Sequence, residues 1–142
     1  MATMTAEGAR ERFAAARVAR LATADADGRP HVVPVVFAVD GDAVLMAVDH
    51  KPKRSRALKR LADIAANPAV CLLADGYQED WDALWWARAD GTARVRPADE
   101  RGDDPAIAAL VAKYPAQYGD RPPPGPVIEV TVTRWSGWTA AG

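Results

Sequence analysis

Residues 18–48 consist of apolar runs joined by short turn sequences, and this pattern limits the possible fold more than any other part of the chain. The first run, 18–25, leads into the turn sequence Asp25-Ala-Asp-Gly-Arg-Pro30. A strongly apolar run follows at 31–39, and Asp40-Gly41-Asp42 separates it from a third run at 43–48. Because such short turns join neighbouring strands that run in opposite directions, the segment predicts an antiparallel sheet.

The rest of the chain adds further strands and a few helices. A helix is predicted at 6–17, with Thr5 as its cap and Ala9, Phe13 and Ala16 on its apolar face. Further helices are predicted at about 53–66 and from Asp104 onward, and strands at 69–74, 83–97 and 127–139. The run 83–97 is either one long strand or a hairpin, with Gly91 at the bulge or the turn. A Pro-rich connector is predicted at 117–126. About six strands and two or three helices in 142 residues favour a single α+β domain over 1–142, mainly β, built on a small closed antiparallel barrel.

Positive charge is concentrated in one short segment. The chain has a net charge of −1, yet residues 51–60 hold six cations: Lys51, Lys53, Arg54, Arg56, Lys59 and Arg60. Without them the chain carries 12 basic and 19 acidic residues, a net charge of −7. The segment is either the solvated face of a helix or an anion-binding site. A nucleic-acid-binding protein would be basic overall or along a whole face, so the distribution favours a small, highly charged anion and no nucleic-acid partner.

The chain has few side chains suited to chemistry of their own. It lacks the glycine-rich loops that bind nucleotides, and His31, His50 and Cys71 are its only histidines and cysteine, so neither a catalytic side chain nor a metal site is predicted. Carboxylates cluster at 79–82 and at Asp103-Asp104, but both clusters lie in predicted loops, and Asp104 is better explained as a helix cap. If the protein is an enzyme, a bound organic cofactor is expected to supply the chemistry.

Two features bear on the location of the protein. The lone Cys71 cannot form an internal disulfide, which favours a reducing, cytoplasmic environment. The longest apolar run, 32–39, is too short to span a bilayer, so no membrane insertion is predicted.

The tryptophans indicate a surface that needs a partner. Adjacent residues of a strand point to opposite faces, so only one of Trp85 and Trp86 can face the interior of a barrel. The other must be covered by a helix of the same chain, by a ligand ring or by a second subunit. Because tryptophan is enriched in the cores of interfaces, a dimer is the favoured alternative.

The sequence as a whole resembles a known family. The run RVARLATADADGRPHVVPVVFAVDGDAVLMAVD, followed by a basic helix ending in IAANPAV, is similar to the split β-barrel flavin and deazaflavin oxidoreductases related to pyridoxamine 5′-phosphate oxidases. The stretches NPAVCLLAD and EDWDALWWARADGTARV most resemble the actinobacterial branch that uses the deazaflavin coenzyme F420. The resemblance implies a six-stranded split barrel that forms a homodimer, with two cofactor sites at the subunit interface.

The resemblance also implies which residues bind the cofactor. The strand Pro34, Val35 and Val36 would lie along the ring system, and Ala47, Val48 and Asp49 would contact the ring and the ribityl chain. Arg60 stands where the family has a phosphate-binding lysine, and a guanidinium can bind phosphate with two hydrogen bonds. Lys51, Lys53 and Arg54 would supply further contacts to the phosphate or the anionic tail. Lys59 is about 100° around the helix from Arg60 and is expected to face elsewhere.

The function expected from the resemblance is that of an F420-dependent reductase, with a small organic molecule as substrate. Two alternatives stay open. One is an FMN-binding oxidase of the same family, and the other is a non-catalytic protein that binds a flavin, haem or another tetrapyrrole.

Overall fold

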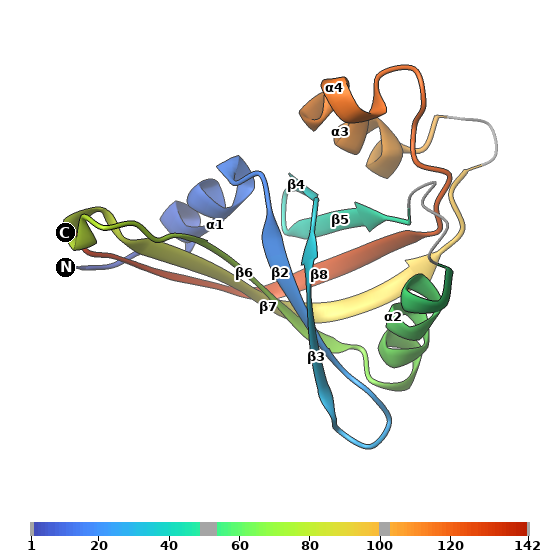
Figure 1. Cartoon of the computed structure of the whole chain (residues 1–142), viewed down its shortest axis with the longest axis horizontal. Helices are drawn as coiled ribbons and strands as arrows, with labels where there is room; N and C mark the ends of the chain where they lie inside the picture. The colour runs from blue at the N-terminus through green and yellow to red at the C-terminus, as the bar shows by residue number, and fades with distance from the viewer. Residues whose placement is uncertain (1, 49–53, 100–102, 142) are drawn as a thin grey trace.

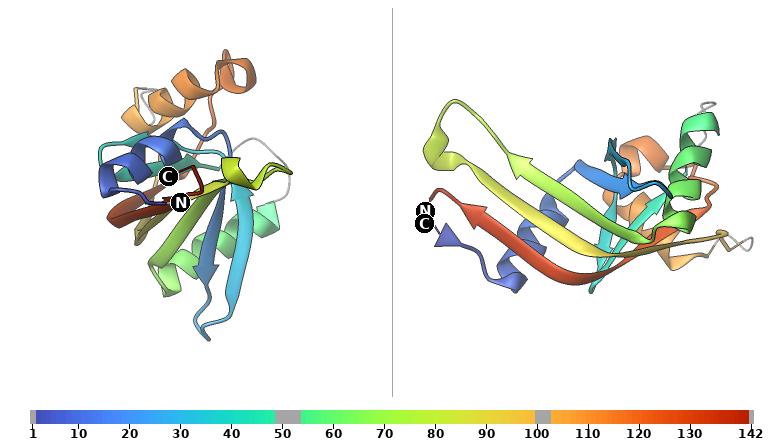
Figure 2. Two further views of the ribbon diagram at one scale, coloured as in Figure 1. Left: turned by 90° about the vertical axis from the view of Figure 1, so that its left-hand side faces the viewer. Right: turned by 90° about the horizontal axis from the view of Figure 1, so that it is seen from below.

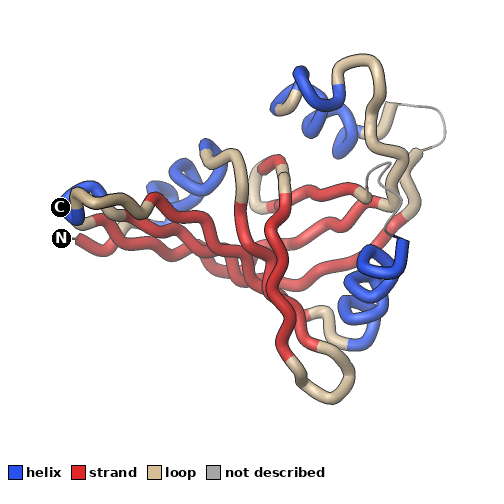
Figure 3. The backbone as a smooth tube through the Cα atoms, viewed as in Figure 1, coloured by secondary structure: helices blue, strands red, loops and turns tan. Residues whose placement is uncertain are grey.

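The computed structural model describes residues 2–48, 54–99 and 103–141, with the backbone alone for 54–58. The strands are β1 (Ala2–Thr3), β2 (Ala19–Ala24), β3 (Pro30–Val35), β4 (Ala38–Asp40), β5 (Ala43–Ala47), β6 (Ala69–Gly76), β7 (Trp85–Arg96) and β8 (Val127–Thr139). The helices are α1 (Ala6–Ala15), α2 (Arg54–Ala66), the 3-10 turn η1 (Trp81–Ala83), α3 (Pro105–Lys113) and α4 (Pro115–Tyr118). The connector predicted at 117–126 therefore begins inside α4. The helices lie around the outside of the strands (Figure 3).

All of these strands belong to one antiparallel sheet, in the order β3-β2-β6-β7-β8-β5-β4, with β1 paired to β8. The two ends of this order, β3 and β4, are separated in the chain by Val36 and Phe37 alone. A two-residue link can join the two ends only if the sheet curls on itself, and the sheet is strongly curved in Figures 1 and 2. No ladder joins β3 to β4 in the described residues, so the curled sheet stays open there.

The described strands number eight, not the predicted six. One addition is the short β1, and the other arises because the run predicted as one strand at 31–39 is divided into β3 and β4. The division falls at Phe37, whose side chain is fully buried. The Tyr114 hydroxyl accepts the Phe37 N–H at 3.2 Å and lies 3.0 Å from its carbonyl oxygen, so these backbone groups bond to α3's end instead of to a strand.

Described helices cover the sheet's core at three places, one of which is α2, whose Ile64 is buried in the core. Ala9 and Phe13 on α1 are fully buried against the sheet, and the Thr5 Oγ1 caps the helix by accepting the Gly8 N–H at 3.0 Å. The predicted apolar face and cap of this helix are confirmed. At the other end, Leu110 on α3 and Tyr118 on α4 pack with Ala38, which places these helices over β4 and β5 (Figure 1).

β7 is one continuous strand with a bulge, and it pairs with β6 and β8 along its length. The register against β8 shifts between Asp90 and Gly91. A Cβ at Gly91 would lie 2.2 Å from the Thr131 carbonyl oxygen, so only glycine fits this close backbone approach. The predicted bulge is confirmed, and the hairpin alternative is excluded. The paired strands β6, β7 and β8 extend beyond the curled part of the sheet, toward the end of the molecule where both termini lie (Figure 1).

Trp85 and Trp86 lie on opposite faces of β7. Trp85 shares its face with the buried Ala87, packs against the core and has the Arg12 guanidinium of α1 4.5 Å above its ring. Trp86 lies on the outer face, opposite Trp138 of β8, and both rings are half-buried. A helix of the same chain therefore covers Trp85, and Trp86 is the ring that faces away from the core.

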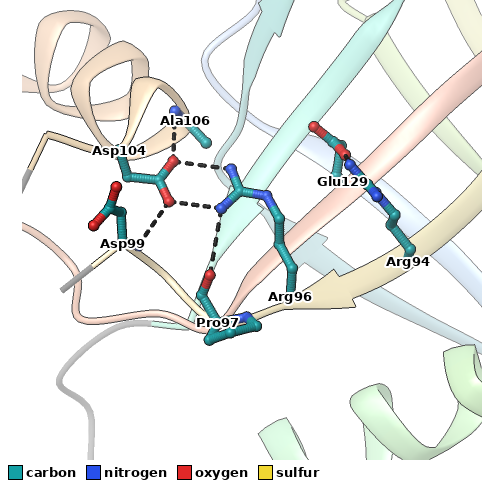
Figure 4. A network of polar contacts seen from close by, with 7 residues as sticks. All are labelled: Arg94, Arg96, Pro97, Asp99, Asp104, Ala106 and Glu129. Atoms are coloured by element: carbon teal, nitrogen blue, oxygen red, sulfur yellow. Dashed lines mark hydrogen bonds and ion pairs between the residues drawn. The ribbon is translucent and has the colours of Figure 1, made fainter.

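An ion pair ties the end of β7 to the start of α3 (Figure 4). Arg96 donates two hydrogen bonds to the Asp104 carboxylate, at 2.6 and 2.9 Å, and Asp104 also accepts the N–H of Asp99 and of Ala106. Only 2% of Asp104 is exposed, and the guanidinium, chiefly, holds the pKa of its carboxyl far below the usual range. The predicted role of Asp104 as a helix cap is confirmed, and Arg96 is its unpredicted partner.

Candidate functional site

A cavity of about 390 Å³ lies between α2 and the β2–β3 hairpin, and we call it the α2 cavity. Its lining is Thr23, His31, Val33, Pro34, Lys59, Arg60 and Asp63. The hairpin register places Thr23 directly opposite His31, and α2 packs against β2 and β7. The cavity therefore joins one wall of strand residues to one wall of charged helix residues.

The helix wall is built by residues one turn apart. Lys59 and Asp63 are four residues apart on α2, and the lysine Nζ lies 3.3 Å from the Asp63 Oδ1. Asp63 is buried, with 5% of its surface exposed, so its carboxylate is shielded from bulk water on this side of the helix. Arg60 lines the cavity beside them. The prediction that Lys59 faces away from Arg60 is wrong, because both residues line this cavity. Although they are about 100° apart around α2, their long side chains reach the same space.

The strand wall carries a second polar pair. His31 is partly exposed, and its Nε2 atom lies 3.9 Å from Asp25 Oδ2 in the β2–β3 turn. That Nε2 atom is buried and has no hydrogen-bond partner within the described part of the chain. Asp25 is held by the turn itself, because its Oδ1 accepts the N–H of Asp27 at 3.0 Å and of Arg29 at 2.9 Å.

The structure brings together two of the residues predicted for the cofactor, Pro34 and Arg60, in the α2 cavity. Val35 is buried on β3, and Val36, just past the strand, is 39% exposed. Neither lines this cavity.

The other predicted contacts lie elsewhere or outside the described residues. Ala47 pairs with Val127 and packs beneath α3, and the Val48 backbone bonds to the Gly125–Pro126 segment at 3.2 and 3.0 Å. Neither residue lines the α2 cavity. Asp49, Lys51 and Lys53 fall outside the described residues, as does the side chain of Arg54, the first residue of α2.

Five residues of the lining were not predicted: Thr23, His31, Val33, Lys59 and Asp63. Part of the signal for them is present in the sequence. The hairpin predicted from 18–39 sets Thr23 opposite His31 once its turn is fixed, and the spacing of Lys59 and Asp63 is that of a helical ion pair. What the sequence does not show is that α2 packs against this hairpin.

A second hollow of about 600 Å³ lies between α2 and β7. Its lining is mostly apolar: Leu61, Ala62, Ile64, Ala65, Pro68, Ala93, Arg94 and Val95. Arg94, the charged residue in the described part of this lining, forms an ion pair with Glu129. The α2 cavity is therefore the better candidate for a charged ligand.

Among the described residues, no three His, Cys, Asp or Glu side chains gather as a metal ion would require. No described helix has the length and apolar character needed to cross a membrane.

The donor groups of the α2 cavity suit an anion that is attached to an apolar body. A guanidinium and an ammonium group offer charge-assisted hydrogen bonds to phosphate or carboxylate oxygens, and the Thr23 hydroxyl adds a neutral donor. Val33 and Pro34 supply apolar surface beside these groups. A phosphorylated flavin or deazaflavin has this combination of parts, so the residues present fit such a cofactor.

The fold is shared with solved structures of proteins that bind different cofactors. A FAD-binding protein from Mesorhizobium loti superposes with a TM-score of 0.68 at 20% identity, covering 96% of this chain and 95% of that one. The FAD-binding protein of Mycobacterium smegmatis gives 0.62 at 22% identity, covering 96% and 97%. A heme storage protein of Vibrio cholerae gives 0.61 at 16% identity, covering 96% and 95%. At these identities the likeness shows the fold alone.

The family is shown by the sequence itself. No curated protein sequence matches the chain, but the family model described as pyridoxamine 5′-phosphate oxidase matches residues 5–139. This range contains every lining residue of the α2 cavity and all strands except β1. The family-level prediction is confirmed: the chain belongs to the pyridoxamine 5′-phosphate oxidase family.

Proposed function

We propose that this protein is an F420-dependent reductase and that the α2 cavity holds the phosphate-bearing part of the cofactor. The observation that carries the proposal is the position of Arg60, which lines one cavity together with Lys59 and Pro34. A phosphorylated, partly apolar ligand needs such a combination of cationic and apolar groups.

Each part of the lining has a binding role in this proposal. Arg60 donates two parallel hydrogen bonds to the phosphate group, and Lys59, oriented by Asp63, adds a second cation. Val33 and Pro34 cover apolar surface of the ligand. The contacts predicted for Val35, Val36, Ala47, Val48, Asp49, Lys51, Lys53 and Arg54 stay predictions from the family resemblance.

Charge favours F420 over FMN as the ligand. F420 carries a phosphodiester, a lactyl carboxylate and an oligoglutamate tail, so it holds more anionic groups than FMN. The segment 51–60 concentrates six cations in an otherwise acidic chain, and four of them belong to α2. Electrostatic attraction to several anionic groups explains this concentration better than attraction to one phosphate.

The chemistry of the reaction belongs to the cofactor. When bound, reduced F420 supplies a hydride to an electron-poor organic acceptor. The residues of the chain bind the cofactor, fix its orientation and exclude water around it, and none is proposed as an acid or base. We place this activity in the cytoplasm, where the lone Cys71 stays reduced.

A second function has support from the fold comparison. The solved structures that share the fold include FAD-binding proteins and a heme storage protein. A protein that holds a flavin or haem without turning over a substrate is therefore the alternative to test.

Titration of the purified protein with F420, FMN and haemin separates these functions. F420 should bind at least about tenfold more tightly than FMN, a difference of about 1.4 kcal/mol, because its tail offers more anionic groups to the cations of α2. Isothermal calorimetry gives both constants, and the absorption spectrum shows any pigment that copurifies. Equal or reversed affinities would assign the protein to the FMN-binding oxidases, and tight haemin binding alone would favour the storage function.

We also propose that the protein is a homodimer, with the cofactor at the subunit interface. The support is the outer face of the β7–β8 ribbon, where Trp86 and Trp138 lie opposite each other and away from the core. Both rings are half-buried within a single chain. Tryptophan is enriched in the cores and hot spots of protein interfaces, so this face is the proposed contact surface.

Sedimentation at low micromolar concentration tests the dimer. The expected mass is about twice 15.2 kDa, because an interface of this type buries more than about 2,000 Å² in total and holds at such concentrations. Trp86→Lys should shift the mass toward that of a single chain, since it places a charge in the buried surface. A wild-type monomer that is folded and binds the cofactor would contradict the interface.

A further inference from the structure

Lys113, the last residue of α3, has a buried side-chain amine with no counterion in the described part of the chain. Its Nζ atom is buried and has no hydrogen-bond partner among the described residues. The atom lies 3.7 Å from the centre of the Phe37 ring and 5.4 Å from that of Tyr114. Aromatic faces attract a cation, but they do not replace the hydrogen bonds that an ammonium group makes in water. The charged form of this amine is therefore poorly solvated.

A second cation lies beside the same tyrosine. The Arg17 guanidinium is 4.5 Å from the centre of the Tyr114 ring, and its Nη1 donates a hydrogen bond to the Lys113 carbonyl oxygen at 3.0 Å. The Tyr114 hydroxyl lies 2.9 Å from the Arg17 carbonyl oxygen, so the end of α3 is held against the connection from α1 to β2. No described carboxylate forms an ion pair with Arg17 or Lys113. Two positive charges therefore meet at this place, and neither has an acidic partner among the described residues.

The arrangement favours reaction of the amine with carbon dioxide. CO2 is small, uncharged and apolar, so its transfer to a buried amine needs little desolvation. Its product with an amine is a carbamate, which is an anion. Formation of a carbamate on Lys113 replaces one of two adjacent cations by an anion, which the Arg17 guanidinium can bind with two hydrogen bonds. A neutral product, such as an amide or an imine, would leave Arg17 without a counterion.

The protonation of Lys113 is compatible with this chemistry. Burial, chiefly, and the positive charge of Arg17 lower the pKa of the Lys113 ammonium group to about 8. About a tenth of the amine is then uncharged at pH 7, and only an uncharged amine has the lone pair that reacts. The flexible four-carbon stem of a lysine lets the product turn from the Phe37 ring toward the guanidinium.

We propose that Lys113 is a site of reversible carbamate formation with carbon dioxide and that Arg17 binds the carbamate. The Lys113 nitrogen forms a bond to the carbon of CO2, one C=O double bond of CO2 becomes a C–O⁻ single bond, and a proton leaves the nitrogen for the solvent. Nothing is oxidised or reduced. The site is separate from the proposed cofactor site, because neither Arg17 nor Lys113 is among the described lining residues of the α2 cavity.

The modification is expected to stabilise the fold. The ion pair between the carbamate and Arg17 joins the end of α3 to the connection between α1 and β2. Because carbon dioxide then binds the folded chain with an additional contact, it should raise the urea concentration at the midpoint of unfolding. Lys113→Arg keeps a positive charge but cannot form the carbamate, so its midpoint should not respond to CO2 in this way.

The direct test uses the full chain without cofactor, in carbon-13-labelled bicarbonate at about pH 8, where half of the amine is uncharged. Carbon NMR detects a carbamate apart from bicarbonate, and trapping with a trialkyloxonium reagent followed by mass spectrometry of peptides identifies the modified residue. The wild type should carry a carbamate on Lys113. Lys113→Arg should lose this signal, while any carbamate on the terminal α-amino group stays.

Two further variants test the arrangement. Lys59→Arg is the matched control, because the Lys59 side chain is half exposed and pairs with Asp63, and it should leave the Lys113 signal unchanged. Arg17→Gln should weaken the binding of CO2 at Lys113 by about tenfold, because the charge-assisted contact to the carbamate is lost. Thermal unfolding without CO2 shows whether each variant is folded.

Three results would overturn the inference. They are a wild-type chain without a carbamate on Lys113, an Arg17→Gln variant that is folded and binds CO2 as tightly as the wild type, and equal shifts of the unfolding midpoint in the wild type and Lys113→Arg. Because these measurements need no F420, they do not depend on the outcome of the cofactor titrations.

Discussion

Arg96→Ala is expected to lower the free energy of unfolding by about 3 kcal/mol, the largest effect predicted for a single side chain here. The substitution leaves the Asp104 carboxylate, 2% exposed, without the guanidinium that donates two hydrogen bonds to it. The N–H groups of Asp99 and Ala106 stay in place but do not neutralise the charge. Urea denaturation followed by tryptophan fluorescence measures the change.

The neighbouring arginine of the same strand is the matched control. Arg94 forms an ion pair with Glu129 (Figure 4), but 71% of the Arg94 side chain is exposed. Arg94→Ala should therefore cost less than about 1 kcal/mol, since solvent screens an exposed pair. If Arg96→Ala and Arg94→Ala lowered the free energy of unfolding equally, burial of Asp104 would not strengthen the Arg96–Asp104 ion pair.

The pH dependence of stability gives an independent check on the same pair. The folded-state pKa of Asp104 lies far below the value of an unfolded aspartate, so its stabilising effect is fully present above about pH 4. The effect is lost as the pH falls from there toward the folded-state pKa, because the unfolded chain binds the proton first. Asp104→Asn should flatten this acid-side loss of stability relative to the wild type.

Much of the fold could be predicted because it depends on local sequence. The turn at Asp40-Gly41-Asp42, the Thr5 cap, the bulge at Gly91 and the Asp104 cap each arise from residues within a few positions of one another, and each is present. The division of the 31–39 run could not be predicted. It depends on the Tyr114 hydroxyl, 77 residues from Phe37 in the chain, and no local pattern encodes that contact.

The candidate site shows the same limit. Arg60 and Pro34 were predicted from family resemblance, and the structure places them in one cavity. The prediction that Lys59 faces away from Arg60 was wrong. The angle between neighbouring residues on a helix does not show the width of the cavity beside that helix, and here both side chains line it. No sequence motif around His31 marks it as a site residue. It lies beside Asp25 because the turn between β2 and β3 folds the second strand back on the first.

The second large effect concerns Arg60 and cofactor affinity. A charge-assisted hydrogen bond of the guanidinium to phosphate contributes about 1.5–3 kcal/mol, so Arg60→Ala should weaken F420 binding roughly ten- to a hundredfold. Arg60→Lys should recover part of this loss, because a lysine keeps the charge but not the two parallel donors. Lys59→Ala should weaken binding less than Arg60→Ala, since part of the Lys59 charge is offset by Asp63.

Arg10→Ala is the control for removal of one positive charge. Arg10 lies on α1, pairs with Glu7 at 2.6 Å and lines neither described hollow, so its loss should leave F420 affinity unchanged. Added salt should weaken F420 binding by the wild type, and Arg60→Ala should show a shallower salt dependence because one screened contact is gone.

The most direct test of the α2 cavity as the cofactor site is the ratio of F420 dissociation constants of Arg60→Ala and Arg10→Ala, measured by calorimetry at one salt concentration. If the α2 cavity holds the phosphate of the cofactor, this ratio should be roughly ten to a hundred, with both variants folded to the same extent without ligand. A ratio of one, with F420 bound tightly by both variants, would contradict this prediction and place the anionic part of the cofactor outside the α2 cavity.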